Sequence, residues 1–163
     1  MLPPYSYVPG KFPHPFADPQ GHSYGQHPEQ PPPLDPQHWQ QCVPYRRGIE
    51  LFDHGYYWEA HESWESVWIA AGREGITADF LKGLIKLAAA GVKAREGRPQ
   101  GVIRHARRGR QLLEDVLRKH ADSDTSRFCG LDLQTLIDQA GQPAPKQPGL
   151  LVTFFAFVVL VMP

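Results

Sequence analysis

The chain has 163 residues, and its 17 Lys and Arg residues balance 17 Asp and Glu residues, so its formal net charge is zero. This length favours one domain and excludes a Rossmann enzyme, a TIM barrel or a two-domain catalyst. The balanced charge excludes a histone-like protein that binds nucleic acid through a charged tail. Twelve of the 17 prolines lie in residues 1–44, whereas 29 of the 34 charged residues lie in residues 44–142. We therefore expect a Pro-rich extended arm at 1–43, a helical domain at 44–142, and a linker with an apolar tail at 143–163.

The arm is too rich in proline for regular secondary structure, because proline lacks a backbone donor and favours extended conformations before it. Tyrosine and phenylalanine alternate with these prolines, although disordered segments are usually poor in aromatic residues. Two interpretations remain open. The arm lies against the core through its aromatic side chains, or it is a flexible leader. The aromatic residues in question are Tyr5, Tyr7, Phe12 and Phe16.

The central segment predicts helices throughout. Pro44 and Pro99 suit first helical positions, Thr77 and Asp132 suit N-caps, and Gly97 suits the position after a helix C-terminus. The expected helices span residues 44–55, 57–71, 78–96, 99–120 and 133–140. Short loops make consecutive helices antiparallel neighbours. We therefore predict an all-α fold, a small antiparallel bundle of about five helices.

The ends of the chain and the two cysteines indicate its compartment. Residues 1–20 contain six prolines and no apolar run, so we expect no secretory signal. Cys42 and Cys129 have no CxxC partner, and we expect free thiols in a reducing, cytoplasmic setting. The uncharged run at 150–162 is short for a membrane span. It is a non-native end, a weak membrane anchor that would make the protein membrane-associated, or a segment packed on the bundle.

The most informative polar residues lie on the expected helix at 57–71. With the aromatic residues of this helix taken as its buried face, His61 lies at the centre of that face, Glu65 lies inside it and Glu62 lies at its edge, whereas Glu59 points away. The expected helix at 99–120 places His105 toward the core as well. A buried carboxylate requires a partner, so these residues form the candidate site.

Three interpretations of this cluster remain open. In the first, the cluster is a structural polar network, in which His61 and Glu65 form hydrogen bonds with each other. In the second, it is a divalent metal site of His61, Glu65 and His105, of the kind that helical bundles build from facing helices. Alternatively, it is an acid–base or ligand-binding site with His61, Glu62, Glu65 and His105 as catalytic residues. The ligand-binding walls of that site would be the aromatic residues Tyr57, Trp58, Trp64 and Trp68.

Positive charge is concentrated between Leu81 and Arg110, where nine basic residues accompany the single acidic Glu96. This is a solvated face balanced by neighbouring acids, or a footprint for an anion or nucleic acid. No stacking aromatic residues accompany these positions, which disfavours binding of single-stranded nucleic acid. The sequence contains no P-loop, Rossmann glycine pattern, GxSxG or HExxH motif.

Two stretches resemble a known family. They are Glu-Leu-Phe-Asp-His-Gly-Tyr-Tyr-Trp-Glu-Ala-His-Glu at 50–62, continued by Glu65 and Trp68, and Phe-Leu-Lys-Gly-Leu-Ile-Lys-Leu-Ala-Ala-Ala at 80–90. Over about residues 45–118 the chain is similar to the domain of unknown function 309 family. The resemblance implies a small, soluble, all-helical bacterial or plastid domain, and it implies no reaction. The Pro-rich arm is similar to leaders of planctomycete members.

These observations lead to two hypotheses about function. The first is a small-ligand-binding, acid–base or metal-dependent site at the His/Glu cluster, with a small molecule as partner. The second is a non-catalytic helical interaction module that presents its basic face to an acidic protein partner or, less favoured, to nucleic acid. An open pocket at His61 would favour the first hypothesis, and steeply salt-dependent binding would favour the second.

Overall fold

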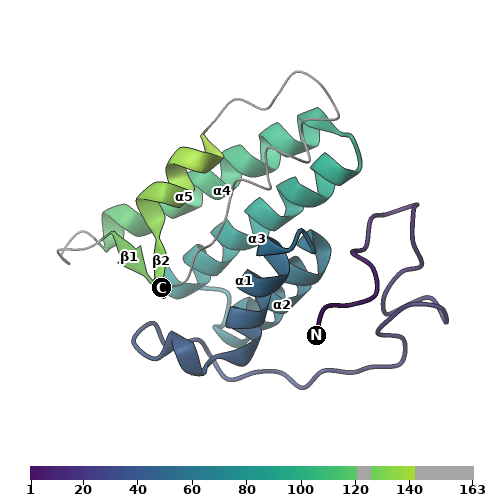
Figure 1. Ribbon diagram of the computed structural model, residues 1–163. Helices are drawn as coiled ribbons and strands as arrows, with labels where there is room; N and C mark the ends of the chain where they lie inside the picture. The colour runs from purple at the N-terminus through teal and green to yellow at the C-terminus, as the bar shows by residue number, and fades with distance from the viewer. Residues whose placement is uncertain (121–125, 142–163) are drawn as a thin grey trace.

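A computed structural model describes residues 1–120 and 126–141 of the chain. It confirms the all-α prediction, because five helices account for most of the described part (Figure 1). The helices are α1 (Val43–Asp53), α2 (Tyr57–Ala70), α3 (Ile76–Arg95), α4 (Pro99–Lys119) and α5 (Leu133–Ala140). A 3-10 helix (Trp39–Gln41) precedes α1, and the short strands β1 (Arg127–Phe128) and β2 (Leu131–Asp132) form an antiparallel hairpin before α5.

Most of the helix boundaries follow the predicted local signals. Pro44 and Pro99 lie in the first turns of α1 and α4. Gly97 follows α3 with a φ of 71°, and the Asp132 carboxylate accepts a hydrogen bond from the Thr135 backbone N–H at the start of α5. The prediction for Thr77 was wrong. Gly75 is the N-cap of α3, and Thr77 already lies in the first turn of the helix.

Gly55 sets the turn between α1 and α2. Its φ is 78°, a left-handed conformation that favours glycine. A Cβ atom at this position would lie 2.6 Å from a guanidinium nitrogen of Arg95, the far end of a flexible side chain that would have to shift. The turn places α2 beside α1, and α3 then packs between α2 and α4.

Small residues allow α3 and α4 to approach closely. A Cβ atom on Gly109 would lie 3.1 Å from the carbonyl oxygen of Gly83, and one on Gly83 would lie 2.8 Å from the Leu113 side chain. The sequence had indicated close helix approach near Gly109, and the structure confirms it. The main core fills the space among the helices, and its largest fully buried side chains include Trp64, Tyr45 and Phe80.

The arm packs on the bundle, which confirms the first of the two interpretations of its aromatic residues. It runs along the side of the molecule formed by α1 and α2 (Figure 1). Val8 is 3% exposed and Leu34 is 5% exposed. The Ser6 hydroxyl donates to the Gly55 carbonyl over 3.1 Å, and the Tyr56 hydroxyl donates to the Pro3 carbonyl over 3.0 Å. The arm is extended, but its polar and apolar groups have defined partners.

Both cysteines are free, as the sequence had indicated, and the structure shows that both are buried. Burial is the main cause that raises the pKa of Cys129 to about 12, so this thiol stays protonated and unreactive at neutral pH. Within residues 1–120 and 126–141, no helix is long and apolar enough to cross a membrane. The predictions for the apolar run at 150–162, and for the tail at 143–163 as a whole, fall outside the described residues.

Candidate functional site

The buried face of α2 lies about a quarter of a turn from where the sequence had placed it. The fully or almost fully buried apolar residues are Tyr57, Ala60, Trp64 and Val67. His61 and Glu65 lie at the edge of this face and are only partly buried, so their expected place in the middle of the core was wrong. The cause is that Trp58 and Trp68 were counted as core, whereas both are partly exposed.

Three side chains on α2 nevertheless converge. His61, Glu62 and Glu65 each offer one ligand atom, and these atoms all lie within 4.8 Å of one another. Helix geometry accounts for two of the pairs, because Glu65 lies four residues after His61 and three after Glu62, and residues at these spacings are neighbours on a helix surface. The sequence had selected all three residues, and the structure places them together.

His61 is not satisfied by its neighbours. Its Nδ1 is buried and has no hydrogen-bond partner among the described residues, although Glu62 Oε1 lies 3.5 Å away as a weak ion-pair partner. The interpretation of the cluster as a closed network, in which His61 and Glu65 satisfy each other, therefore receives no support from the hydrogen bonding. A polar atom in this situation is available to a ligand.

His105 on α4 lies outside the group of three atoms but within electrostatic reach of it. Its pKa is lowered, mainly because the ring is partly desolvated, and nearby positive charges add to the effect. These charges belong to Lys86, Arg104, Lys93 and His61. The lowered pKa favours the neutral imidazole at neutral pH, which is the form that accepts a proton or binds a metal.

The four aromatic residues that were expected to line a ligand site do not share one wall. Tyr57 and Trp64 are core residues, 3% and 0% exposed, and the Trp64 indole N–H donates to the Tyr45 carbonyl over 3.1 Å. Trp58 faces the arm, where its ring meets those of Tyr7, His14 and Phe16. Trp68 lies near the C-terminal end of α2, partly buried against the core.

Trp68 is flanked by two cations. The Arg73 guanidinium carbon lies 5.4 Å from the ring centroid and the Lys82 ammonium lies 5.5 Å from it. The indole N–H of Trp68 is buried and has no hydrogen-bond partner among the described residues. Lys82 was expected on the outer face of its helix, but this contact directs it toward α2.

Sequence reasoning placed Glu59 on the solvent side of α2, and this was wrong. Its side chain is 6% exposed, because the arm covers it. Glu59 Oε1 accepts the Tyr7 backbone N–H over 2.8 Å and lies 3.3 Å from His22 Nε2, whereas its Oε2 has no hydrogen-bond partner among the described residues. The aromatic residues of the arm were the one signal that could have predicted this cover.

The basic residues between Leu81 and Arg110 are only partly neutralised. Lys93 and Arg98 both pair with Glu96, and Arg110 pairs with Glu114. Arg104, Arg107 and Arg108 are exposed on α4. Positive charge therefore remains on one side of α4, next to His105.

Residues 45–105 match the family model described as "Domain of unknown function (DUF309)". This match supports the resemblance found in the sequence, and it contains most of α1, all of α2 and α3 with the three clustered residues, and His105 on α4. It does not contain the arm, so the similarity to planctomycete leaders stays a prediction, as do the bacterial origin and the cytoplasmic location. No curated protein and no solved structure matches the chain.

Proposed function

We propose that His61, Glu62 and Glu65 bind a divalent metal ion on the partly exposed surface of α2. The observation that supports this proposal best is the convergence of one imidazole and two carboxylates within 4.8 Å. Ligand atoms about 2.0–2.2 Å from one ion lie at most roughly 4.4 Å apart. Small side-chain rotations therefore suffice to bring the three atoms around a common ion.

The chemistry of the ligands narrows the choice of metal. One nitrogen and two carboxylate oxygens, without a thiolate, suit Zn²⁺ or Mn²⁺ better than a soft ion. Three protein ligands leave room for a water molecule or a substrate atom, as catalytic metal sites do. Such an ion would polarise a bound ligand, and the neutral ring of His105 on α4, which His61 influences electrostatically, is the candidate to move a proton. The proposal is thus a metal-dependent acid–base site for a small molecule.

Metal titration of the full chain tests the proposal. After treatment with EDTA and dialysis, Zn²⁺ or Mn²⁺ should bind with one ion per chain in calorimetry and should raise the melting temperature. His61→Ala and Glu65→Ala should each weaken binding at least tenfold. Glu74→Ala, an exposed carboxylate in the turn after α2, is the matched control and should bind as the wild type does. Absence of binding to the wild type, or equal binding by all variants, would refute the proposal.

A second function is favoured by one observation, the exposed row of Arg104, Arg107 and Arg108 on α4. We propose it as an alternative role, in which this surface meets an acidic protein or nucleic acid. Binding of polyglutamate or of duplex DNA should then weaken steeply as salt increases, because contacts of this kind release counterions. Replacement of the three arginines by glutamine should abolish this binding, and binding that is insensitive to salt would rule it out.

A further inference from the structure

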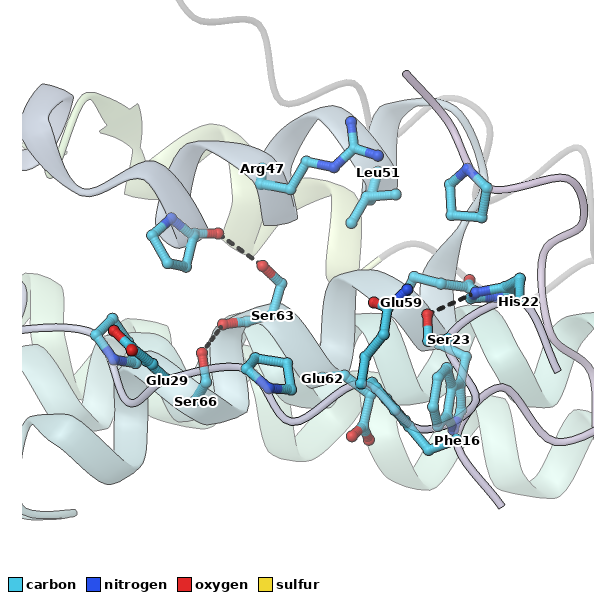
Figure 2. Close-up of a pocket in the computed structure, with 16 residues that line it drawn as sticks. Phe16, His22, Ser23, Glu29, Arg47, Leu51, Glu59, Glu62, Ser63 and Ser66 are labelled. Atoms are coloured by element: carbon cyan, nitrogen blue, oxygen red, sulfur yellow. Dashed lines mark hydrogen bonds and ion pairs between the residues drawn. The ribbon is translucent and has the colours of Figure 1, made fainter. Parts of the chain in front are cut away.

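We propose that the pocket between the arm and helices α1 and α2 binds a small organic cation with an apolar part. The pocket has a volume of about 460 Å³, within the range of small-molecule sites. Figure 2 shows Glu59, His22 and Phe16 at one end of it and Glu29 at the other. Its lining shares Glu62 with the proposed metal site but includes neither His61, Glu65 nor His105.

Glu59 is the first argument for a cationic ligand. Its carboxylate is 94% buried, since its side chain is 6% exposed, and His22 is the only ion-pair partner it has among the described residues. That pair is charged on both sides only when His22 is protonated. Because Glu59 Oε2 also lacks a hydrogen-bond donor, the buried carboxylate is incompletely compensated. A cation in the adjoining pocket would supply this compensation through space, because charges interact strongly where water is scarce.

The remaining polar groups of the pocket also favour a donor-rich ligand. Glu29 and Glu62 add two carboxylates to the lining. The Ser63 hydroxyl donates to the Pro44 carbonyl and the Ser66 hydroxyl donates to the Ser63 carbonyl, each over 2.8 Å, so both oxygens retain lone pairs as acceptors. An ammonium group, with three N–H donors, complements such a lining.

The two basic side chains of the pocket are already engaged. Arg47 donates to Glu50 and to the Met1 carbonyl, and His22 Nδ1 lies 2.8 Å from the Ser23 hydroxyl while its Nε2 meets Glu59. They therefore do not provide a free site for an anion. The pocket thus attracts positive rather than negative ligands.

Two aromatic rings form a wall for the apolar part of the ligand. Trp58 from α2 and Phe16 from the arm both line the pocket, and their ring centroids lie 6.0 Å apart. Aromatic faces attract an organic cation as well as its hydrocarbon portion. The ligand class is therefore a primary amine with an aryl or alkyl group. Because the arm supplies part of the wall, binding also fastens the arm to the bundle.

The test uses 2-phenylethylamine as the probe and 2-phenylethanol as its neutral counterpart, with the full chain in EDTA. We expect the amine to change tryptophan fluorescence in a saturable manner and to raise the melting temperature, whereas the alcohol does neither at the same concentration. Glu59→Gln, which keeps the acceptor for Tyr7, should weaken amine binding at least fivefold. Glu29→Gln changes an exposed residue and should weaken amine binding about twofold. This variant therefore tests the proposal even if Glu59→Gln fails to fold.

Glu74→Gln is the matched control, because Glu74 is an exposed carboxylate after α2 that does not line the pocket. This variant should bind the amine as the wild type does. The inference would be overturned by equal binding of amine and alcohol, by no binding of either, or by loss of amine binding in Glu74→Gln with retention in Glu59→Gln. Since EDTA is present throughout, failure here leaves the metal proposal unaffected, and failure of the metal proposal leaves this one unaffected.

Discussion

The two ends of α2 carry similar residues but have different surroundings. Near the N-terminus, Trp58 and Glu59 lie beneath the arm, and the Glu59 side chain is 6% exposed. Toward the C-terminus, Glu65 is only partly buried, and Trp68, also partly buried, meets the cations Arg73 and Lys82. The comparison shows that a distant segment of chain can decide what surrounds a tryptophan and a glutamate on one helix.

The tryptophans should show the largest difference between the two ends of α2. Trp58→Ala removes the ring that packs against Tyr7, His14 and Phe16, and we expect a loss of about 3 kcal/mol in the free energy of unfolding. Trp68→Ala removes contacts with Arg73 and Lys82 and some packing against the edge of the core, and its cost should be smaller, about 1–2 kcal/mol. Urea denaturation measures both values.

Hydrogen exchange checks the structural basis of that difference. Trp58→Ala should accelerate amide exchange in residues 5–22 of the arm, and Trp68→Ala should leave the arm unchanged. If the two variants lose equal stability, or if the arm exchanges equally fast in both, the packing of the arm contributes little and the comparison fails.

The glutamates should differ less. Glu59→Ala leaves the Tyr7 backbone N–H without its acceptor, and we expect a loss of about 1–2 kcal/mol. Glu65→Ala should change stability by at most about 0.5 kcal/mol when EDTA removes bound metal, because its carboxylate is partly solvated. Denaturation of both variants under identical conditions gives the result. A larger loss of stability for Glu65→Ala would show that the partly exposed Glu65 is structurally essential.

The smallest expected effect concerns His105 and pH. The pKa of His105 is lowered in the folded protein, so the unfolded chain takes up a proton first as pH falls below about 6.5. His105 therefore lowers stability progressively from about that pH downward and has no effect well above it. In His105→Gln, the fall in melting temperature between pH 7 and pH 5 should be shallower than in the wild type. A steeper or unchanged fall in the melting temperature of His105→Gln would contradict a lowered pKa of His105.

Much of the fold could be predicted because its signals are local. Pro99, Gly97 and Asp132 mark helix ends through backbone chemistry that acts over a few residues, and each was predicted correctly. Thr77 failed because a glycine two residues earlier, with a φ of 89°, already forms the cap. The hairpin at 127–132 was missed because strands of two residues carry no detectable periodicity.

The candidate site was predictable in part. His61, Glu62 and Glu65 could be grouped from their spacing alone, because one helix positions all three. Their degree of burial could not be predicted, because the sequence alone does not distinguish an aromatic residue in the core from one at the helix surface. The pocket lined by Glu59 was missed for the same reason.

The sequence by itself determined the helices, most of their ends and the three candidate ligand residues on α2, because these depend on interactions between residues close in the chain. Only the tertiary structure decided which part of α2 the arm covers. The contacts that cover Glu59 join residues 52 and 37 positions apart, Tyr7 and His22 with Glu59. Contacts of such separation depend on the packing of the whole chain, and no local pattern of residues specifies them.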